Sequence, residues 1–183
     1  MKAMQRIAGG LLLVGVLGLT ACGQRPVYYP PLPVSEIQTY FSEAATTQAI
    51  DTAYYEIKDA NDNMIGTVLF SSPYSDAVKG FNGPTPLLIA LDTEGRIKQV
   101  VLMDNQETPR FAKRVVDGGL YETWNGLTVA EAMEKEVDAI SGATFTSNGV
   151  KNSLVARLKA YEEQLKKDRT SEKKGFWQRL FSK

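Results

Sequence analysis

The feature that most constrains the fold is a pair of apolar runs joined by a polar turn in residues 85–105, TPLLIALDTEGRIKQVVLMDN. Residues 87–91 are all apolar, the segment DTEG has turn-forming residues, and residues 97–103 return as a second strand-like run. This pattern predicts an antiparallel hairpin. We expect its two strands to be the central pair of a sheet.

A second hairpin is predicted earlier in the chain. The segments AYYEIKD (residues 53–59) and MIGTVLFSS (residues 64–72) are both rich in strand-forming residues, and the polar turn NDN lies between them. Asn and Asp favour such turns because their side chains bond to the nearby backbone. The two hairpins together predict a mainly antiparallel sheet.

Three short helices are expected, each with a residue that favours a helix start: Ser35 before residues 36–45, Pro109 within residues 106–119, and Thr128 before residues 129–137. Thr128 and Glu131 also have the spacing of a capping box.

A long C-terminal helix is expected from about residue 148 to residue 167. It has one apolar stripe, made of Val150, Leu154, Val155, Leu158, Tyr161 and Leu165. Because strands and helices neither alternate nor repeat, we predict an α+β fold: a mainly antiparallel sheet flanked by helices.

The composition excludes several classes of protein. The 183 residues include no histidine and a single cysteine, Cys22, and the formal net charge is zero. Zinc fingers, haem-attachment motifs and iron–sulfur clusters need several Cys or His ligands, so we expect no metal site. A histidine-based triad is impossible. A nucleic-acid partner is not expected either, since the chain lacks an excess of basic residues.

The first 22 residues resemble a bacterial lipoprotein signal. Lys2 and Arg6 precede the short apolar stretch 7–19, and the segment LTAC ends at Cys22. This resembles the lipobox, in which the cysteine receives acyl chains (palmitate among them) and becomes the mature N-terminus. The alternatives are an ordinary cleaved signal or a transmembrane anchor, but the stretch is short for a membrane span. The lipoprotein interpretation places the protein outside the cytoplasm, anchored in a lipid bilayer through Cys22.

Four segments follow from this organisation. We expect a signal peptide in residues 1–21, a lipidated Pro-rich tether in residues 22–34, one domain in residues 35–167, and a basic, aromatic tail in residues 168–183. The tail is either a solvated end or a short amphipathic helix that touches anionic lipid or a partner protein.

The segment DAISGATFTSNGV, residues 138–150, has the chemistry of an anion site. Gly142 permits positive φ and close approach of a ligand. Hydroxyl and amide groups come from Ser141, Thr144, Thr146, Ser147 and Asn148. The following helix start offers unpaired N–H groups and a partial positive charge. The residues alone leave two interpretations equally open: a phosphate site, or a helix cap with a glycine lead-in. The segment is neither a P-loop nor a dinucleotide fingerprint.

The same segment resembles the flavinylation motif D-x-x-[ST]-G-A-[ST] of the FMN-binding domain family. This domain occurs in the C subunit of the sodium-pumping NADH:quinone oxidoreductase, in the G subunit of the Rnf complex and in stand-alone extracytoplasmic proteins. The motif positions are Asp138, Ser141, Gly142, Ala143 and Thr144.

The resemblance implies that Thr144 carries FMN through a phosphoester bond. A separate flavin transferase, using FAD and magnesium, would install the cofactor, and Asp138 would serve that transferase. Thr146 is the neighbouring alternative acceptor, two residues beyond the motif position. The resemblance covers roughly residues 64–165, and it implies that a membrane-bound or extracytoplasmic redox partner exchanges electrons with the flavin.

Other flavin contacts are expected in loops. Gly83, Pro84, Glu107 and Thr108 are candidates to line the isoalloxazine, although ordinary turn chemistry would also explain them. Tyr121 and Trp124 either stack on the ring or pack in the core. Glu131, Glu134 and Glu136 are expected on a solvated helix face, and no catalytic carboxylate pair is evident.

Three functions are compatible with these features. The first is an electron carrier with covalent FMN, in which the cofactor supplies the reactivity and the protein sets its position. The second is an extracytoplasmic flavin-dependent reductase of a small acceptor. The third is a lipoprotein that binds a partner without redox chemistry.

Overall fold

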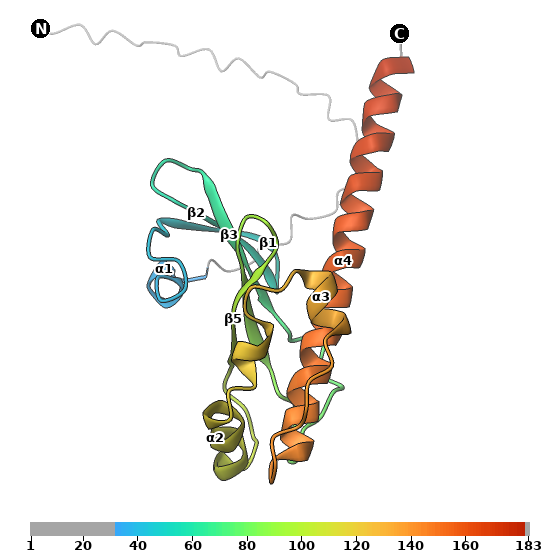
Figure 1. Cartoon of the computed structure of the whole chain (residues 1–183). Coiled ribbons are helices and arrows are strands. Elements are labelled where there is room, and N and C mark those ends of the chain that lie inside the picture. The colour runs from blue at the N-terminus through green and yellow to red at the C-terminus, as the bar shows by residue number, and fades with distance from the viewer. Residues whose placement is uncertain (1–31, 182–183) are drawn as a thin grey trace, which may run out of the picture.

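Five antiparallel strands form one sheet in the order β1-β2-β3-β4-β5, so each strand pairs with its neighbour in sequence. A computed structural model describes residues 32–181 of the chain. The strands are β1 Thr46–Asp51, β2 Tyr54–Lys58, β3 Met64–Phe70, β4 Leu87–Leu91 and β5 Ile97–Leu102. The helices are α1 Val34–Ile37, α2 Pro109–Asp117, the 3-10 helix η1 Tyr121–Trp124, α3 Val129–Glu134 and α4 Thr144–Phe181. The predicted α+β class is confirmed (Figure 1).

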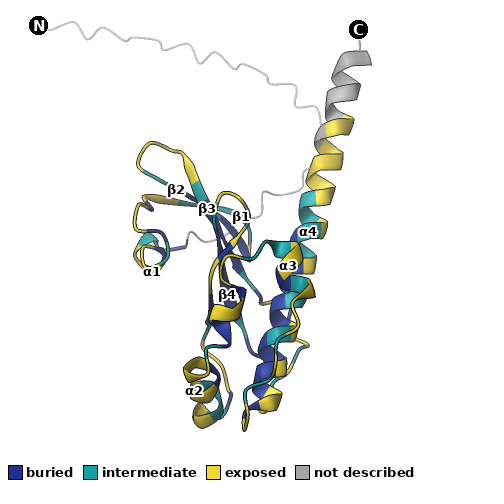
Figure 2. Ribbon diagram, in the orientation of Figure 1, coloured by how far each residue is buried: buried dark blue, intermediate teal, exposed yellow. Residues whose placement is uncertain are grey.

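Both faces of the sheet are covered, which explains the continuous apolar run of β4. All five β4 residues are buried. Leu87, Ile89 and Leu91 point to the core shared with α4, whereas Leu88 and Ala90 point to the core shared with α1. This alternation follows from the period of two in a strand. Figure 2 shows the buried residues along the sheet and along the adjoining half of α4.

The two predicted hairpins are present, but β4 and β5 are not the central pair. The middle strand is β3, and β5 lies at the edge. The expectation was wrong because the sheet ends at β5, whose single strand partner within residues 32–181 is β4. Strand β1 was not predicted: its sequence, TTQAID, is mostly polar and none of its residues is buried. The outer edge of β5 is covered at one end, where Ile97 N–H donates to Leu127 O at 2.8 Å and Gly126 N–H donates to Ile97 O at 2.7 Å. This partial cover limits pairing with another chain.

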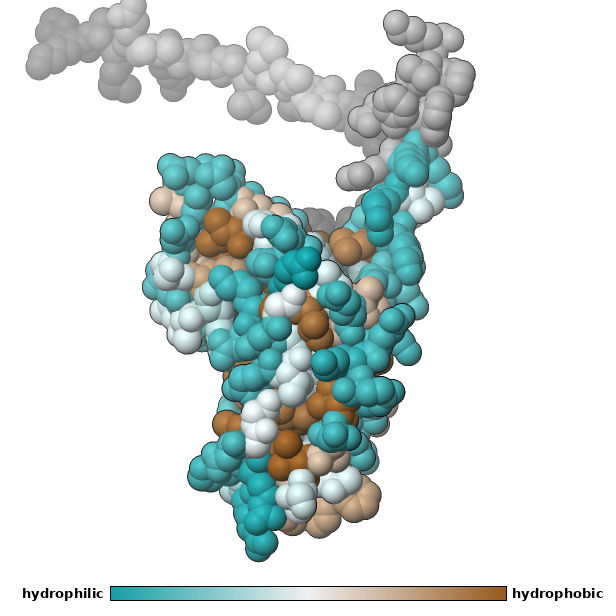
Figure 3. Space-filling view, viewed as in Figure 1, coloured by the Kyte–Doolittle hydropathy of each residue, from teal (hydrophilic) through white to brown (hydrophobic). Residues whose placement is uncertain are grey.

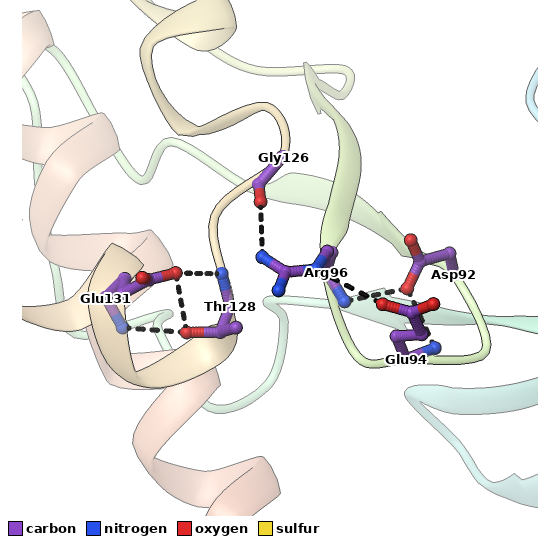
Figure 4. Close-up of polar contacts among 6 residues, drawn as sticks. All are labelled: Asp92, Glu94, Arg96, Gly126, Thr128 and Glu131. Atoms are coloured by element: carbon purple, nitrogen blue, oxygen red, sulfur yellow. Dashed lines mark hydrogen bonds and ion pairs between the residues drawn. The ribbon is translucent and has the colours of Figure 1, made fainter.

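The turn between β4 and β5 is tied to the start of α3 (Figure 4). Asp92 Oδ1 accepts from the backbone N–H groups of Glu94 and Arg96, and Arg96 Nη1 donates to Gly126 O at 3.1 Å. The predicted capping box is confirmed: Glu131 N–H donates to Thr128 Oγ1, and Thr128 N–H donates back to Glu131 Oε2. Glu131 is therefore a capping residue at the surface.

Two helices differ from the sequence expectation. The first, α1, has only four residues and follows Pro33, so Ser35 lies inside it instead of capping it. The long helix α4 begins four residues earlier than predicted and runs to Phe181 without a break at residue 167. The division into a domain of residues 35–167 and a tail of residues 168–183 stays a prediction.

Arg157 connects α4 to the end of β3 and to the turn between β1 and β2. Its side chain is fully buried; Nε donates to Phe70 O at 2.8 Å and Nη2 donates to Ala53 O at 3.0 Å. Its guanidinium carbon also lies 4.5 Å from the centre of the Tyr74 ring, a cation–π distance. Burial lowers the pKa of Arg157 from its usual value.

Several predicted segments lie outside the described residues. They are the signal peptide 1–21, the lipidated Cys22 and the first ten residues of the 22–34 tether. Among the helices of residues 32–181, none has the length and apolar character needed to cross a membrane.

Candidate functional site

The motif segment is a tight loop that leads directly into α4. Ala143 N–H donates to Ile140 O at 2.9 Å, and Gly142 between them has a φ of +75°, which favours glycine. Ser147 closes the loop: its Oγ accepts from Ile140 N–H at 3.1 Å and donates to Ala143 O at 3.0 Å. Buried Ser147 thus fixes the loop that presents Thr144.

Helix α2 packs against this loop through two contacts one helical turn apart. A Cβ on Gly118 would lie 2.8 Å from Ile140 Cδ1, so the end of α2 and the loop are in van der Waals contact. The guanidinium of Arg114 lies against Gly142, where it occupies the space that a Cβ on Gly142 would need. Gly142 therefore provides both the turn and room for an arginine.

Thr144 is the first residue of α4, and it is exposed. The first N–H groups of a helix have no acceptor within the helix, and the helix dipole adds a partial positive charge there. A phosphoryl group on the Thr144 hydroxyl would therefore lie in a favourable field. The predicted helix start, Asn148, lies a full turn inside the helix instead.

Thr146 has the opposite environment. Its side chain is fully buried, and its hydroxyl donates a hydrogen bond to Glu107 Oε2. Thr144 and Thr146 are separated by one residue, but only Thr144 presents an exposed hydroxyl.

Glu107 organises the loop of residues 79–85. Its carboxylate accepts from the backbone N–H groups of Phe81 at 3.1 Å, Asn82 at 2.7 Å and Gly83 at 3.1 Å. Burial raises the pKa of this carboxyl, but the hydrogen bonds from Thr146 and the three backbone groups outweigh it and hold the pKa below its usual value. Glu107 is thus an ionised, nearly buried anchor.

The same loop lies directly on α4 because two glycines meet there. A Cβ on Gly149 would come 2.6 Å from Gly80 Cα, and one on Gly80 would come 2.9 Å from Glu107 Cδ. Backbone therefore packs on backbone at this crossing. This contact brings Phe81 beside the first turn of α4.

An open, mainly apolar cavity of about 230 Å³ lies where these segments meet. Its lining residues are Phe81, Phe111, Gly142, Ala143, Thr144, Phe145 and Thr146. The Phe81 and Phe111 rings pack edge to face at 5.0 Å, and the Phe145 ring is 6.3 Å from Phe81. Phe81 and Phe145 are more than half exposed. Figure 3 shows apolar surface at the end of the molecule where α2 and the beginning of α4 lie.

The cavity gathers only some of the residues predicted to bind the cofactor. Gly142, Ala143, Thr144 and Thr146 line it, whereas Gly83, Pro84, Glu107 and Thr108 do not. Asp138, Ser141 and Asn148 are exposed, and Asp138 faces a second hollow beside Lys135 and Gly118. Tyr121 and Trp124 are buried in the core shared with α4, so their predicted alternative, packing, is the one observed.

Four residues at this site were not singled out by sequence reasoning: Phe81, Phe111, Phe145 and Arg114. They come from three separate segments, and no spacing rule connects them. Phe145 alone had a local signal, because it is the large aromatic residue within the small, polar motif segment.

The residues present fit a flavin phosphate. Gly142 lets the Arg114 guanidinium approach the loop, α4 begins at Thr144, and aromatic rings form the adjoining wall. Aromatic rings offer flat apolar faces to a planar ring system. Within residues 32–181, no cluster of three or more Cys, Asp or Glu side chains is arranged to hold a metal ion.

Comparison with known proteins agrees with this geometry. Residues 80–159 match the family model of the FMN-binding domain, and the resemblance inferred from the motif segment is confirmed. The matched region begins at the Gly80 loop and extends through α2, the motif and most of the packed half of α4.

Two individual proteins are similar to the chain. The G subunit of the ion-translocating oxidoreductase complex of Stutzerimonas stutzeri is 28% identical over an alignment of 107 residues, which covers 52% of this chain and 47% of that protein. The chain therefore spans about half the length of this curated relative. The crystal structure of Shewanella oneidensis NqrC is 23% identical, with a TM-score of 0.42 over 62% of this chain and 60% of that one.

Proposed function

We propose that this chain is an extracytoplasmic, lipid-anchored flavoprotein that carries FMN covalently on Thr144 and passes electrons between redox partners. One observation carries the proposal: Thr144 is exposed, is the first residue of α4 and lines a cavity with aromatic walls. The match of residues 80–159 to the FMN-binding domain supports the identity of the cofactor.

The environments of the two candidate threonines favour Thr144 as the acceptor. A transferase needs access to the hydroxyl oxygen, and Thr144 is exposed. The Thr146 hydroxyl is buried and already donates to Glu107. Modification of Thr146 would break that bond and force a phosphoryl group against a carboxylate, which like-charge repulsion disfavours.

The attachment step is the transfer of the FMN phosphoryl group of FAD to the Thr144 hydroxyl. The Thr144 hydroxyl oxygen attacks the phosphorus of the FMN half of FAD, a new P–O ester bond forms, and the bond between the two phosphates breaks. AMP leaves, and the hydroxyl proton passes to solvent or to a base of the transferase. Nothing is oxidised or reduced in this step, which the flavin transferase catalyses with magnesium.

After attachment, each part of the site has a separate role. The start of α4 would hold the phosphate, and the Phe81, Phe111 and Phe145 rings would provide an apolar wall for the isoalloxazine. Glu107 fixes the loop that carries Phe81. When bound, FMN supplies one- and two-electron redox chemistry. The protein residues bind and orient, and none is assigned as catalytic.

The predicted lipid anchor gives this arrangement a location. Acyl chains on Cys22 would hold the domain at the outer face of a membrane through the 22–34 tether. A covalent bond suits that place, because a dissociated flavin would be lost by dilution. The partner would be a membrane-bound or extracytoplasmic redox protein, and the similarity to a component of an ion-translocating oxidoreductase complex supports that partner class.

Intact mass tests the covalent assignment. The full chain is co-expressed with a flavin transferase, denatured and weighed. The wild type is expected to gain one FMN less one water, and Thr144→Ala is expected to gain nothing. Thr93→Ala, which removes an exposed threonine hydroxyl outside the motif, in the turn between β4 and β5, is expected to gain as the wild type does. An unchanged mass in the wild type, or a mass gain in Thr144→Ala, would refute the assignment.

A further inference from the structure

The charge on α2 nearest the motif is not paired. Among the described residues 32–181, the Arg114 side chain has no hydrogen bond or ion pair. Its neighbour Lys113, by contrast, bonds to Asp117 at 2.7 Å. The Arg114 guanidinium instead lies against Gly142, two residues before Thr144. Arg114 is exposed, and its planar group with five N–H donors lies at the loop without a protein acceptor in the described residues.

The packing of α2 places the Arg114 position beside the motif loop. Phe111 and Arg114 are three residues apart on α2, which places them on the same side of the helix. Phe111 lines the cavity, and Gly118 holds the end of α2 on Ile140. One face of α2 therefore presents an aromatic ring and a cation toward the same motif loop.

We propose that Arg114 is the cationic ligand of the phosphoryl group on Thr144. Gly142 lacks a side chain, and this lets the guanidinium reach the phosphoryl group. This inference rests on the proposed attachment of FMN to Thr144. A phosphodiester carries one negative charge at neutral pH, and arginine donates to phosphate oxygens through two parallel N–H bonds. The helix start supplies backbone N–H donors and a partial charge, and Arg114 adds the full positive charge.

The pairing predicts a difference in the stability gained on flavinylation. Wild type, Arg114→Gln and Arg110→Gln are compared, each with and without FMN, by urea unfolding. Arg110 is exposed on the same helix, so its substitution removes the same charge from α2 without touching the loop. We expect flavinylation to raise the folding equilibrium constant of wild type and Arg110→Gln by about two- to fivefold more than that of Arg114→Gln. Raising the salt to about 1 M should reduce the difference, because screening shortens to about 3 Å.

Phosphorus-31 NMR gives a readout that does not depend on stability. The phosphodiester resonance should shift in Arg114→Gln and stay in place in Arg110→Gln. Loss of both the stability difference and the resonance shift would overturn the role of Arg114 and leave the covalent assignment intact. If the wild type gains no FMN mass, the proposed function fails, and this inference fails with it.

A double-mutant cycle in the flavin-free protein tests the proposal even if the transferase does not modify Arg114→Gln. Thr144→Asp places an anion at the acceptor position, and Thr144→Asn is its neutral match. The ratio of the folding equilibrium constants of the Thr144→Asp and Thr144→Asn variants should be about two- to fivefold larger with Arg114 present than in the Arg114→Gln background. Equal ratios in the two backgrounds would overturn the proposal.

Discussion

Thr146 on the first turn of α4 donates its hydroxyl to Glu107, a residue 39 positions earlier in the chain. Through this bond, the helix that carries Thr144 is connected to the loop that carries Phe81. The same carboxylate accepts three backbone N–H groups of that loop. One buried carboxylate therefore links the helix that carries Thr144 to the loop that carries Phe81, and the Thr146 hydroxyl has a structural contact.

Removal of the Thr146 hydroxyl should destabilise the fold. Thr146→Val keeps the shape but takes one donor from an ionised, nearly buried carboxylate, so we expect a loss of about 1.5–3 kcal/mol in the free energy of unfolding. Thr144→Val is the matched control, because the Thr144 hydroxyl is exposed, and it should change stability by less than about 0.5 kcal/mol. Urea unfolding of the flavin-free chains measures both. Equal effects would show that the bond to Glu107 contributes nothing.

Glu107 should make stability depend on acid pH. Its folded-state pKa is below its usual value, whereas the unfolded value is about 4.3. The stabilisation is therefore complete above about pH 4.3 and is lost as the pH falls through the folded-state pKa. Relative to wild type, Glu107→Gln should be less stable at neutral pH and should lose less stability on acidification. Urea midpoints between about pH 6 and pH 3 give the comparison, and parallel curves for the two proteins would rule out this linkage.

Much of the fold follows from local patterns. Apolar runs and polar turns identify four of the five strands, and the Thr128–Glu131 spacing identifies the start of α3. Strand β1 could not be predicted because its residues are mostly polar and none of them is buried. The continuous apolar run of β4 made the β4–β5 pair look central, although β5 is at the edge. Strand order depends on what pairs at each edge, which local sequence does not encode.

The candidate site divides in the same way. The motif residues lie in one segment, and Thr144 is named from their resemblance to the flavinylation motif; its attachment to FMN stays a prediction. The wall of the cavity comes from the Gly80 loop, α2 and α4, and only folding brings Phe81, Phe111 and Phe145 together. The predicted flavin contact of Glu107 stays a prediction. Its carboxylate is occupied by loop and helix donors, and it does not line the cavity.

The crossing of Gly149 and Gly80 should be intolerant of a methyl group. In most helices Gly→Ala stabilises by about 1 kcal/mol. At Gly149, however, the Cβ would come 2.6 Å from Gly80 Cα, and backbone has to move, so we expect a net loss of about 1–3 kcal/mol. Asn148→Ala, at the exposed neighbouring position, gains helix propensity without the clash and should be neutral or slightly stabilising. Thermal unfolding of both variants tests this, and a stabilised Gly149→Ala would contradict the close crossing.

The flavin environment should depend on the aromatic wall. In the flavinylated chain, Phe111→Ala removes the ring that packs at 5.0 Å on Phe81 and opens one side of the cavity. If the isoalloxazine lies there, iodide should quench its fluorescence more strongly than in wild type. Val116→Ala is the matched control, because Val116 is an exposed apolar residue of the same helix that does not line the cavity. Mass spectra first establish that each variant carries FMN, and urea unfolding shows that each is folded. Equal quenching in Phe111→Ala, Val116→Ala and wild type would place the ring outside the cavity, even if Thr144 is its point of attachment.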